Sequence, residues 1–204
     1  MTETIDLQQL ASPLSPKSGA KTLDQIWPIG LAVCLATSRP SGLDINSPIP
    51  CNLTPDCIGT YWVRRLDIPD HVQCTCTYCD SEEILINWRG TWWDFHKELL
   101  RSQLASEHSA VPVSNTLLSV PQYLQLCQVW SLPRQLLLSL YRAKRVRKQY
   151  QLRLAPGELA ELDVFMKNEA SGKSLPSSTL KLLNRINART LSVQKPNQRS
   201  RQTD

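Results

Sequence analysis

The sequence predicts an α+β protein, in which a small β-rich N-terminal module precedes a basic α-helical C-terminal module. Five of the seven cysteines lie between residues 51 and 79, where apolar and polar residues alternate as they do in strands. After residue 97, apolar residues recur at helical spacing instead. Charge divides in the same way, because residues 1–107 carry 13 acidic and 8 basic side chains, whereas residues 108–204 carry 5 acidic and 15 basic ones.

The first 55 residues contain few regular patterns. Residues 1–22 are rich in Ser, Pro, Thr and Gln, so we expect a disordered lead-in there. The apolar run Leu31–Ala36 predicts a short buried strand, since a proline precedes it and an Arg-Pro-Ser-Gly turn follows it. Residues 41–55 contain several prolines, which interrupt strand pairing, and therefore predict a loop.

The β pattern continues to residue 96. Three strands are expected, over Tyr61–Leu66, His71–Tyr78 and Ile84–Trp88. Arg89-Gly90 predicts a tight turn, after which residues 91–96 return as the second arm of a hairpin. Residues 23–106 therefore form the predicted β-rich module, which is rich in Cys and Trp. A module this small buries little apolar surface and benefits from an additional staple.

Helical spacing dominates the remainder of the chain. We expect a helix over residues 97–105, a linker over residues 107–120 and a basic helical module over residues 121–191. Four helices are expected in that module, over residues 121–130, 131–153, 158–167 and 177–191. Ser131 is the expected N-cap of the second helix, with Pro133 in its first turn. Residues 192–204 predict a disordered basic tail.

The clustered cysteines predict a structural zinc site. Zn²⁺ prefers four sulfur or imidazole ligands in a tetrahedron, and a gap of two residues lets two thiolates turn onto one ion. The expected ligands are Cys51, Cys57, Cys76 and Cys79, with Cys74 and His96 as substitutes. A shell of four thiolates leaves no open position for catalysis. The alternative is that these residues are free buried cysteines, which pack as small apolar side chains.

A basic cluster marks the second expected helix. Five of seven consecutive positions are basic: Arg142, Lys144, Arg145, Arg147 and Lys148. No acidic residue occurs between Glu107 and Glu158, so the cluster has no neutralising partner nearby in sequence. Displacing counter-ions from a phosphate backbone favours binding, which makes RNA or DNA the expected partner. The run Lys-Arg-Val-Arg also fits a nuclear import signal, and a solvated surface is the remaining alternative.

Protein partners form the rival interpretation. Residues 131–137 read Ser-Leu-Pro-Arg-Gln-Leu-Leu, which resembles the Leu-Pro-x-x-Leu-Leu opening of F-box segments and implies recruitment of a ubiquitin-ligase scaffold. The Leu132–Leu140 helix and an exposed member of the pair Trp92 and Trp93 are the expected contacts with such a partner. This adaptor role includes host-interaction factors of the accessory type that viruses encode.

The remaining patterns limit the function classes. The chain has three histidines, no Gly-rich phosphate loop and no nucleophile or zinc-protease motif, so we expect no enzymatic activity. It has no signal peptide and no apolar run near 20 residues, so we expect a protein of the nucleus or cytoplasm without membrane contact. The predicted function is a non-catalytic intracellular regulator that acts on transcription or on RNA.

Overall fold

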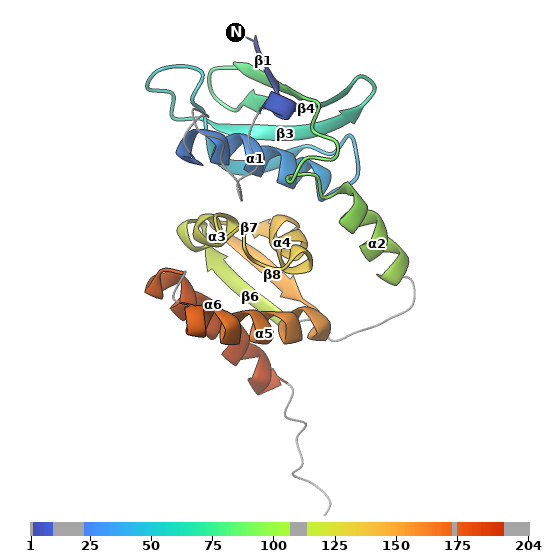
Figure 1. Cartoon of the computed structure of the whole chain (residues 1–204). Coiled ribbons are helices and arrows are strands. Elements are labelled where there is room, and N and C mark those ends of the chain that lie inside the picture. Colours follow the sequence, from blue (N-terminus) through green and yellow to red (C-terminus); the bar gives the residue numbers. More distant parts are fainter. Residues whose placement is uncertain (1, 10–22, 107–113, 173–174, 194–204) are drawn as a thin grey trace, which may run out of the picture. The chain divides into compact units, whose positions relative to one another are not determined.

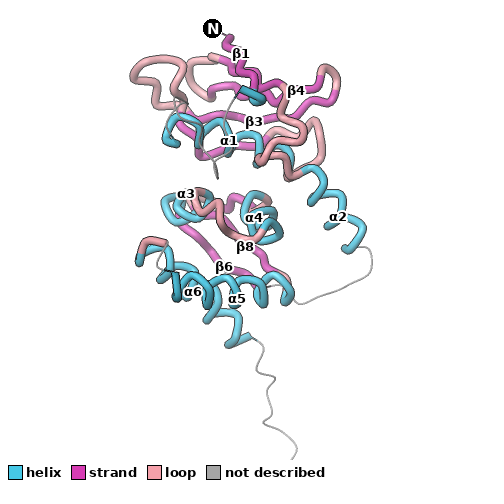
Figure 2. Tube along the Cα trace, viewed as in Figure 1, coloured by secondary structure: helices cyan, strands magenta, loops and turns pink. Residues whose placement is uncertain are grey.

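The computed structural model describes residues 2–9, 23–106, 114–172 and 175–193 (Figures 1 and 2). The chain forms two compact units, residues 1–109 and residues 110–204. Within the described residues the fold is α+β, with one five-stranded sheet, one three-stranded sheet and six α-helices. Of the helices in this described part, none combines the length and the apolar character that crossing a bilayer requires.

The N-terminal unit is built on the five-stranded sheet, whose order is β1-β5-β4-β3-β2. Its strands are β1 (Thr2–Asp6), β2 (Ile45–Pro50), β3 (Thr60–Asp67), β4 (Asp70–Cys76) and β5 (Glu82–Ile86). β1 pairs with β5 in parallel, and the other neighbours are antiparallel. Helix α1 (Leu23–Thr37) packs on β2, β3 and β4 and covers one face of the sheet, and α2 (His96–Ser106) follows the sheet in the chain (Figure 1).

The period of two along each strand sorts side chains between the two faces of this sheet. Val63, Val72 and Leu85 are fully buried on the face that α1 covers. On the opposite face Trp62 is 41% exposed, and its strand neighbours on that face are polar. The three central strands lie where the sequence pattern predicts them, because alternation specifies both the strand and the side that faces the core.

Four predictions for this unit are wrong. Leu31–Ala36 belongs to helix α1, because a short apolar run that is buried on every side carries no period to separate helix from strand. Residues 45–50 form β2 despite their prolines, which an edge strand tolerates. Residues 2–6 form β1, with Ile5 buried, and residues 10–22 lie outside the described part. Residues 91–96 do not form the predicted second arm of a hairpin, since they contain no strand and α2 already begins at His96.

In the C-terminal unit, α3, α4 and α6 pack on a three-stranded antiparallel sheet of order β6-β8-β7, and α5 packs on α4 and α6. Its elements are β6 (Ser114–Ser119), α3 (Val120–Cys127), α4 (Arg134–Tyr141), β7 (Lys144–Val146), β8 (Gln149–Leu154), α5 (Pro156–Gly172) and α6 (Ser177–Val193). Ser119 begins α3 with a capping box, in which its hydroxyl accepts from Gln122 N and the Gln122 side chain accepts from Ser119 N. Leucines from β8, α3, α4, α5 and α6 line a shared apolar core.

The prediction of one basic helix over residues 131–153 is wrong. Helix α4 ends at Tyr141, and a β7–β8 hairpin follows it. The N-cap of α4 is Pro133, which offers no capping side chain, so Ser131 does not have the predicted role. The linker prediction fails for Ser114–Ser119, which is strand β6, and residues 107–113 lie outside the described part. The tail prediction fails for residues 192 and 193, which end α6, and residues 194–204 lie outside the described part.

Replacing Gly30 by Ala should destabilise the N-terminal unit. Gly30 lies in α1, and a Cβ atom there would sit 2.3 Å from Nε1 of the buried Trp93 ring. Because overpacking a core forces side chains and backbone to shift, we expect Gly30→Ala to lower the free energy of unfolding by about 1–3 kcal/mol. Denaturant unfolding followed by circular dichroism measures this change.

The matched control is Gly157→Ala in the first turn of α5, where an added Cβ meets no atom within 4 Å. Alanine is the better helix former, so this variant should be neutral or slightly more stable. Equal destabilisation by the two substitutions would contradict the packing of α1 on Trp93.

Candidate metal centre and basic hairpin

Two loops meet at one end of the five-stranded sheet, and we call them the metal loops. The first, residues 51–59, connects β2 to β3, and the second, residues 77–81, connects β4 to β5. They meet because β3 and β4 are antiparallel neighbours, so Tyr61 near the start of β3 lies opposite Cys76 at the end of β4. Sequence positions about 20 residues apart are thereby brought side by side.

Four cysteine sulfurs converge where the metal loops meet, on Cys51, Cys57, Cys76 and Cys79. All four Sγ atoms lie within 4.8 Å of one another. Two of the Sγ–Sγ separations are 3.6 Å, between Cys57 and Cys76, and 3.7 Å, between Cys51 and Cys79. A tetrahedron with metal–sulfur bonds of about 2.3 Å has sulfur–sulfur edges of about 3.8 Å. The cluster therefore has the dimensions needed to hold one metal ion, and its members are the four ligands that the sequence spacing favoured.

Backbone hydrogen bonds close both metal loops. Cys51 N donates to Gly59 O at 2.9 Å, and Cys76 N donates to Ser81 O at the same distance. Gly59 is also required sterically, because a Cβ atom there would lie 2.5 Å from Cys76 Sγ. The chain thus approaches the sulfur cluster more closely than any residue with a side chain allows.

Hydrogen-bond donors point at three of the four sulfurs. The contacts run from Gly59 N to Cys57 Sγ (3.4 Å), from Tyr78 N and Cys79 N to Cys76 Sγ (3.3 and 3.5 Å), and from Thr54 Oγ1 to Cys79 Sγ (3.3 Å). Donors stabilise a sulfur most when it carries negative charge, as a metal-bound thiolate does. This pattern fits ligands better than it fits neutral thiols packed as apolar side chains.

Two thiols of the cluster differ widely in pKa. Hydrogen bonds from Ser81 and Thr54 lower the pKa of Cys79 to about 5. The backbone N–H of Gly59 also acts to lower the pKa of Cys57, but burial and the neighbouring thiols raise it to about 12. Like charges this close cannot all form without compensation, so without a cation the cluster ionises only in part. A bound metal ion removes this repulsion and deprotonates the remaining thiols.

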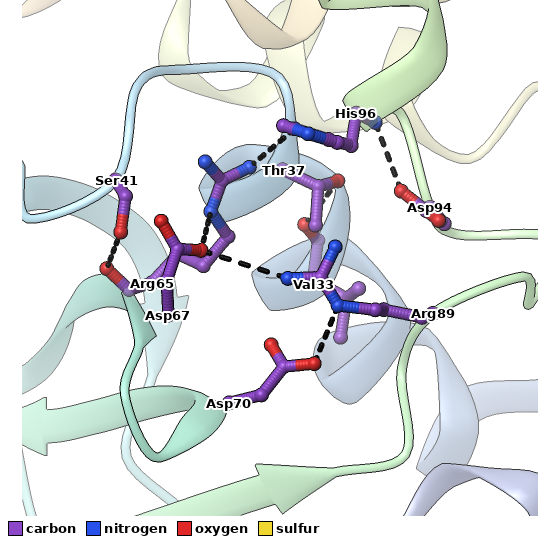
Figure 3. A network of polar contacts seen from close by, with 9 residues as sticks. All are labelled: Val33, Thr37, Ser41, Arg65, Asp67, Asp70, Arg89, Asp94 and His96. Carbon is purple, nitrogen blue, oxygen red and sulfur yellow. Dashed lines mark hydrogen bonds and ion pairs between the residues drawn. The ribbon is translucent and has the colours of Figure 1, made fainter.

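The two substitute ligands lie outside the sulfur cluster. Cys74 is fully buried, opposite Glu83 on the neighbouring strand, and burial followed by the charge of Glu83 raises the pKa of its thiol well above the usual value. His96 is held instead by Arg65, whose Nη1 donates to His96 Nδ1 at 2.9 Å (Figure 3). Since a guanidinium only donates, Nδ1 of His96 is the acceptor in this contact.

Arg65 itself is only 4% exposed and is part of a chain of charges (Figure 3). Its Nε forms an ion pair with Asp67 at 3.3 Å, and Arg89 links Asp67 to Asp70. Both guanidinium groups also lie over the buried ring of Trp88, at 5.8 and 4.5 Å from its centroid. This network joins the start of α2 to the sheet near Arg65 and Asp67, toward the end of β3 that is away from Cys76, so His96 is not part of the sulfur cluster.

Four of the five basic residues lie on the β7–β8 hairpin and its turn, and the fifth, Arg142, is the C-cap of α4. All five residues that were predicted to contact nucleic acid are exposed: Arg142, Lys144, Arg145, Arg147 and Lys148. Arg147 adopts a φ of 56° at the turn, a left-handed conformation that is unfavourable for a residue with a side chain. The predicted charge is thus presented by a hairpin, from an edge strand, and not by a helix.

The hairpin adds one basic residue that the sequence interpretation missed. Lys144 pairs with Gln151, so both share a sheet face with the exposed Arg153 two positions further along β8. The stretch from Gln149 to Leu154 alternates polar and apolar residues strictly, which is the period of a strand. That alternation could have identified Arg153 as a neighbour of the basic cluster.

The two predicted contacts for a protein partner differ in exposure. Trp93 is 1% exposed, whereas Trp92 is half-buried. The leucines of the Leu132–Leu140 segment are buried as well, and they line the core of the C-terminal unit. Among the described tryptophans, Trp62 is the one classed as exposed, with 41% of its surface accessible.

Comparison with known proteins gives no match: no protein-family model, no curated protein and no solved structure is significantly similar to the chain. The assignment of both sites therefore depends on their geometry and charge.

The purified protein should carry one metal ion per chain, and binding of this ion should require the cysteines of the sulfur cluster. Cys76→Ser removes a ligand, so we expect it to lose the metal. Cys74→Ser changes a buried cysteine on the same strand that lies outside the cluster, so it should retain one equivalent. Elemental analysis of the three proteins after dialysis measures the stoichiometry. Equal metal content in the two variants would contradict the assignment of ligands.

Proposed function

We propose that this chain is a non-catalytic regulatory protein of the nucleus or cytoplasm, in which a structural zinc ion holds the N-terminal unit and the basic hairpin binds nucleic acid. The observation that carries the zinc assignment is the four-sulfur cluster, with its edges of 3.6 and 3.7 Å. Four thiolates in a tetrahedron select zinc or an iron–sulfur centre and leave no open position for a reaction. Nothing in the cluster provides a base or a substrate site.

Zinc is the better occupant of the cluster for a physical reason. Its d¹⁰ shell imposes no geometric preference, so it accepts the ligand positions that the two metal loops provide. Binding also supplies folding energy, because the unfolded chain offers no preformed site. A sheet that α1 covers on one face is the kind of small structure that needs such a contribution.

The nucleic-acid assignment is supported by the exposure of the hairpin and by its uniform sign of charge. Lys144, Arg147 and Lys148 are exposed, and no acidic residue occurs between Glu107 and Glu158. A basic two-stranded ribbon can enter the major groove or follow a phosphate backbone. Strain at Arg147 further supports a functional role, since an arginine occupies a position that glycine would fill without strain.

Binding through the hairpin should depend steeply on salt. We expect a fluorescein-labelled oligonucleotide to bind the full chain with an affinity that falls linearly in a plot of log K against log salt. Replacing Lys144, Arg147 and Lys148 together by Ala should weaken binding and reduce the slope by about two to three units. Fluorescence anisotropy between 50 and 300 mM salt measures both quantities. An unchanged affinity would exclude this hairpin as the contact.

Arg147→Gly provides a matched control for loss of folding. Glycine adopts the φ of 56° without strain, so this variant should fold at least as stably as the parent protein. It still lacks one charge, so its salt slope should fall by about one unit. A stable Arg147→Gly protein with the parent's slope would contradict a phosphate contact at this residue.

A second candidate function is that of a protein-interaction adaptor, and one observation favours it. Ile58 and Tyr78 lie on the two metal loops with 82% and 68% of their surface exposed, so the two loops together present two large apolar side chains to solvent. If this function is correct, Ile58→Ser and Tyr78→Ser will leave oligonucleotide affinity and metal content unchanged. Loss of nucleic-acid affinity in these variants would instead favour the first candidate.

A further inference from the structure

A hollow of about 380 Å³ lies on the face of the five-stranded sheet opposite α1. Its lining residues are Asp44, Trp62, Arg64, Gln73 and Thr75. This volume is near the lower end of the usual range for ligand pockets, about 300–1,000 Å³. It contains no member of the sulfur cluster and no residue of the basic hairpin.

Strand register explains how the hollow forms. Trp62 and Arg64 are two apart on β3, so they share a face of the sheet. Their partners on β4 are Thr75 opposite Trp62 and Gln73 opposite Arg64. The four side chains therefore make a rectangle at the centre of the sheet, with one large aromatic ring and three polar groups. The Gln73 amide is oriented by a hydrogen bond to the Glu82 carboxylate of β5.

The Arg64 side chain is held in place by Asp44, and one of its nitrogen atoms remains able to donate a hydrogen bond to a ligand. Its Nε and Nη2 atoms donate to the two carboxylate oxygens of Asp44, at 2.6 and 2.5 Å. This bidentate pair fixes the plane of the Arg64 guanidinium, which lines the hollow together with Trp62. Among the contacts of the described residues, Nη1 of Arg64 has no hydrogen-bond partner, and the Arg64 side chain is 40% exposed.

We propose that one unpaired base of a single-stranded nucleic acid stacks on Trp62 in this hollow, with Arg64, Gln73 and Thr75 available to the edges of the base. The proposal rests on the nucleic-acid function proposed for the hairpin and specifies its ligand as single-stranded. Single-strand binders commonly combine an aromatic platform with a separate basic track, and aromatic residues on central strands stack bases in sheet-based RNA binders. Here the platform and the basic track belong to different units.

The charge of the N-terminal unit distinguishes base stacking from phosphate binding. Residues 1–107 carry a net charge of −5, and the lining of the hollow contains one cation, Arg64, which is paired with Asp44. The hollow therefore contributes affinity that salt does not screen. The salt dependence of its contribution therefore differs from that of the hairpin, because binding by the hairpin releases counter-ions.

The test measures affinity and its salt slope with two probes, a labelled oligouridine of 12 nucleotides and a labelled RNA duplex of 12 base pairs. For Trp62→Ala we expect an affinity for oligouridine about 5- to 150-fold lower, with an unchanged salt slope. Duplex affinity should not change, because paired bases are not available for stacking. Trp62→Phe, which keeps an aromatic ring, should recover most of the affinity.

Ile68→Ala is the surface control, since Ile68 is 93% exposed beyond the other end of β3. It should match the parent protein on both probes. Metal content and circular dichroism of Trp62→Ala check that the sheet is intact. Oligouridine binding that is insensitive to Trp62 overturns the inference and leaves the hairpin function standing. A parallel loss on duplex and single strand also overturns it, and absence of any nucleic-acid binding overturns both proposals.

Discussion

The convergence of four cysteine sulfurs is the constraint on which the N-terminal unit depends. The metal loops have few apolar side chains to hold them, since Ile58 and Tyr78 point to solvent. What fixes them is backbone hydrogen bonding around the sulfurs and, in our proposal, an ion shared by both loops. Structural zinc sites contribute on the order of 10 kcal/mol, which is comparable to the whole stability of a typical domain. Loss of the ion would therefore release both connections, β2–β3 and β4–β5, together.

Sequence reasoning reached the sulfur cluster because its signals are local. Cys76-x2-Cys79 is a turn, Cys51 and Cys57 flank one loop, and alternation predicts the strands that bring these loops together. The sequence favoured Cys76 over Cys74 because of the two-residue gap before Cys79, but it kept Cys74 as a substitute, because the two cysteines share a sheet face and only the position along β4 decides which one reaches the cluster. His96 was also undecidable from spacing, since its partner Arg65 is buried on a distant part of the chain.

The basic cluster shows the opposite case, in which composition was informative and periodicity was misread. Leu136, Leu137 and Leu140 have helical spacing, and the helix they predict was extended through residues that form a hairpin. Strict alternation from Gln149 to Leu154 marks the true element, and the left-handed Arg147 marks its turn. The same difficulty applies to helix α1, because an apolar run that is buried on all sides is compatible with a helix or a strand. Tertiary burial, and not local preference, decides such segments.

X-ray absorption at the zinc edge of the purified full-length protein tests the central claim most directly. The four-sulfur cluster predicts a first shell of four sulfur atoms at about 2.3 Å, with no nitrogen or oxygen neighbour. A shell that contains nitrogen would indicate that a histidine replaces one cysteine. A shell with two or fewer sulfurs, or a protein that retains no zinc, would contradict the account, because the two metal loops would then have no ion in common.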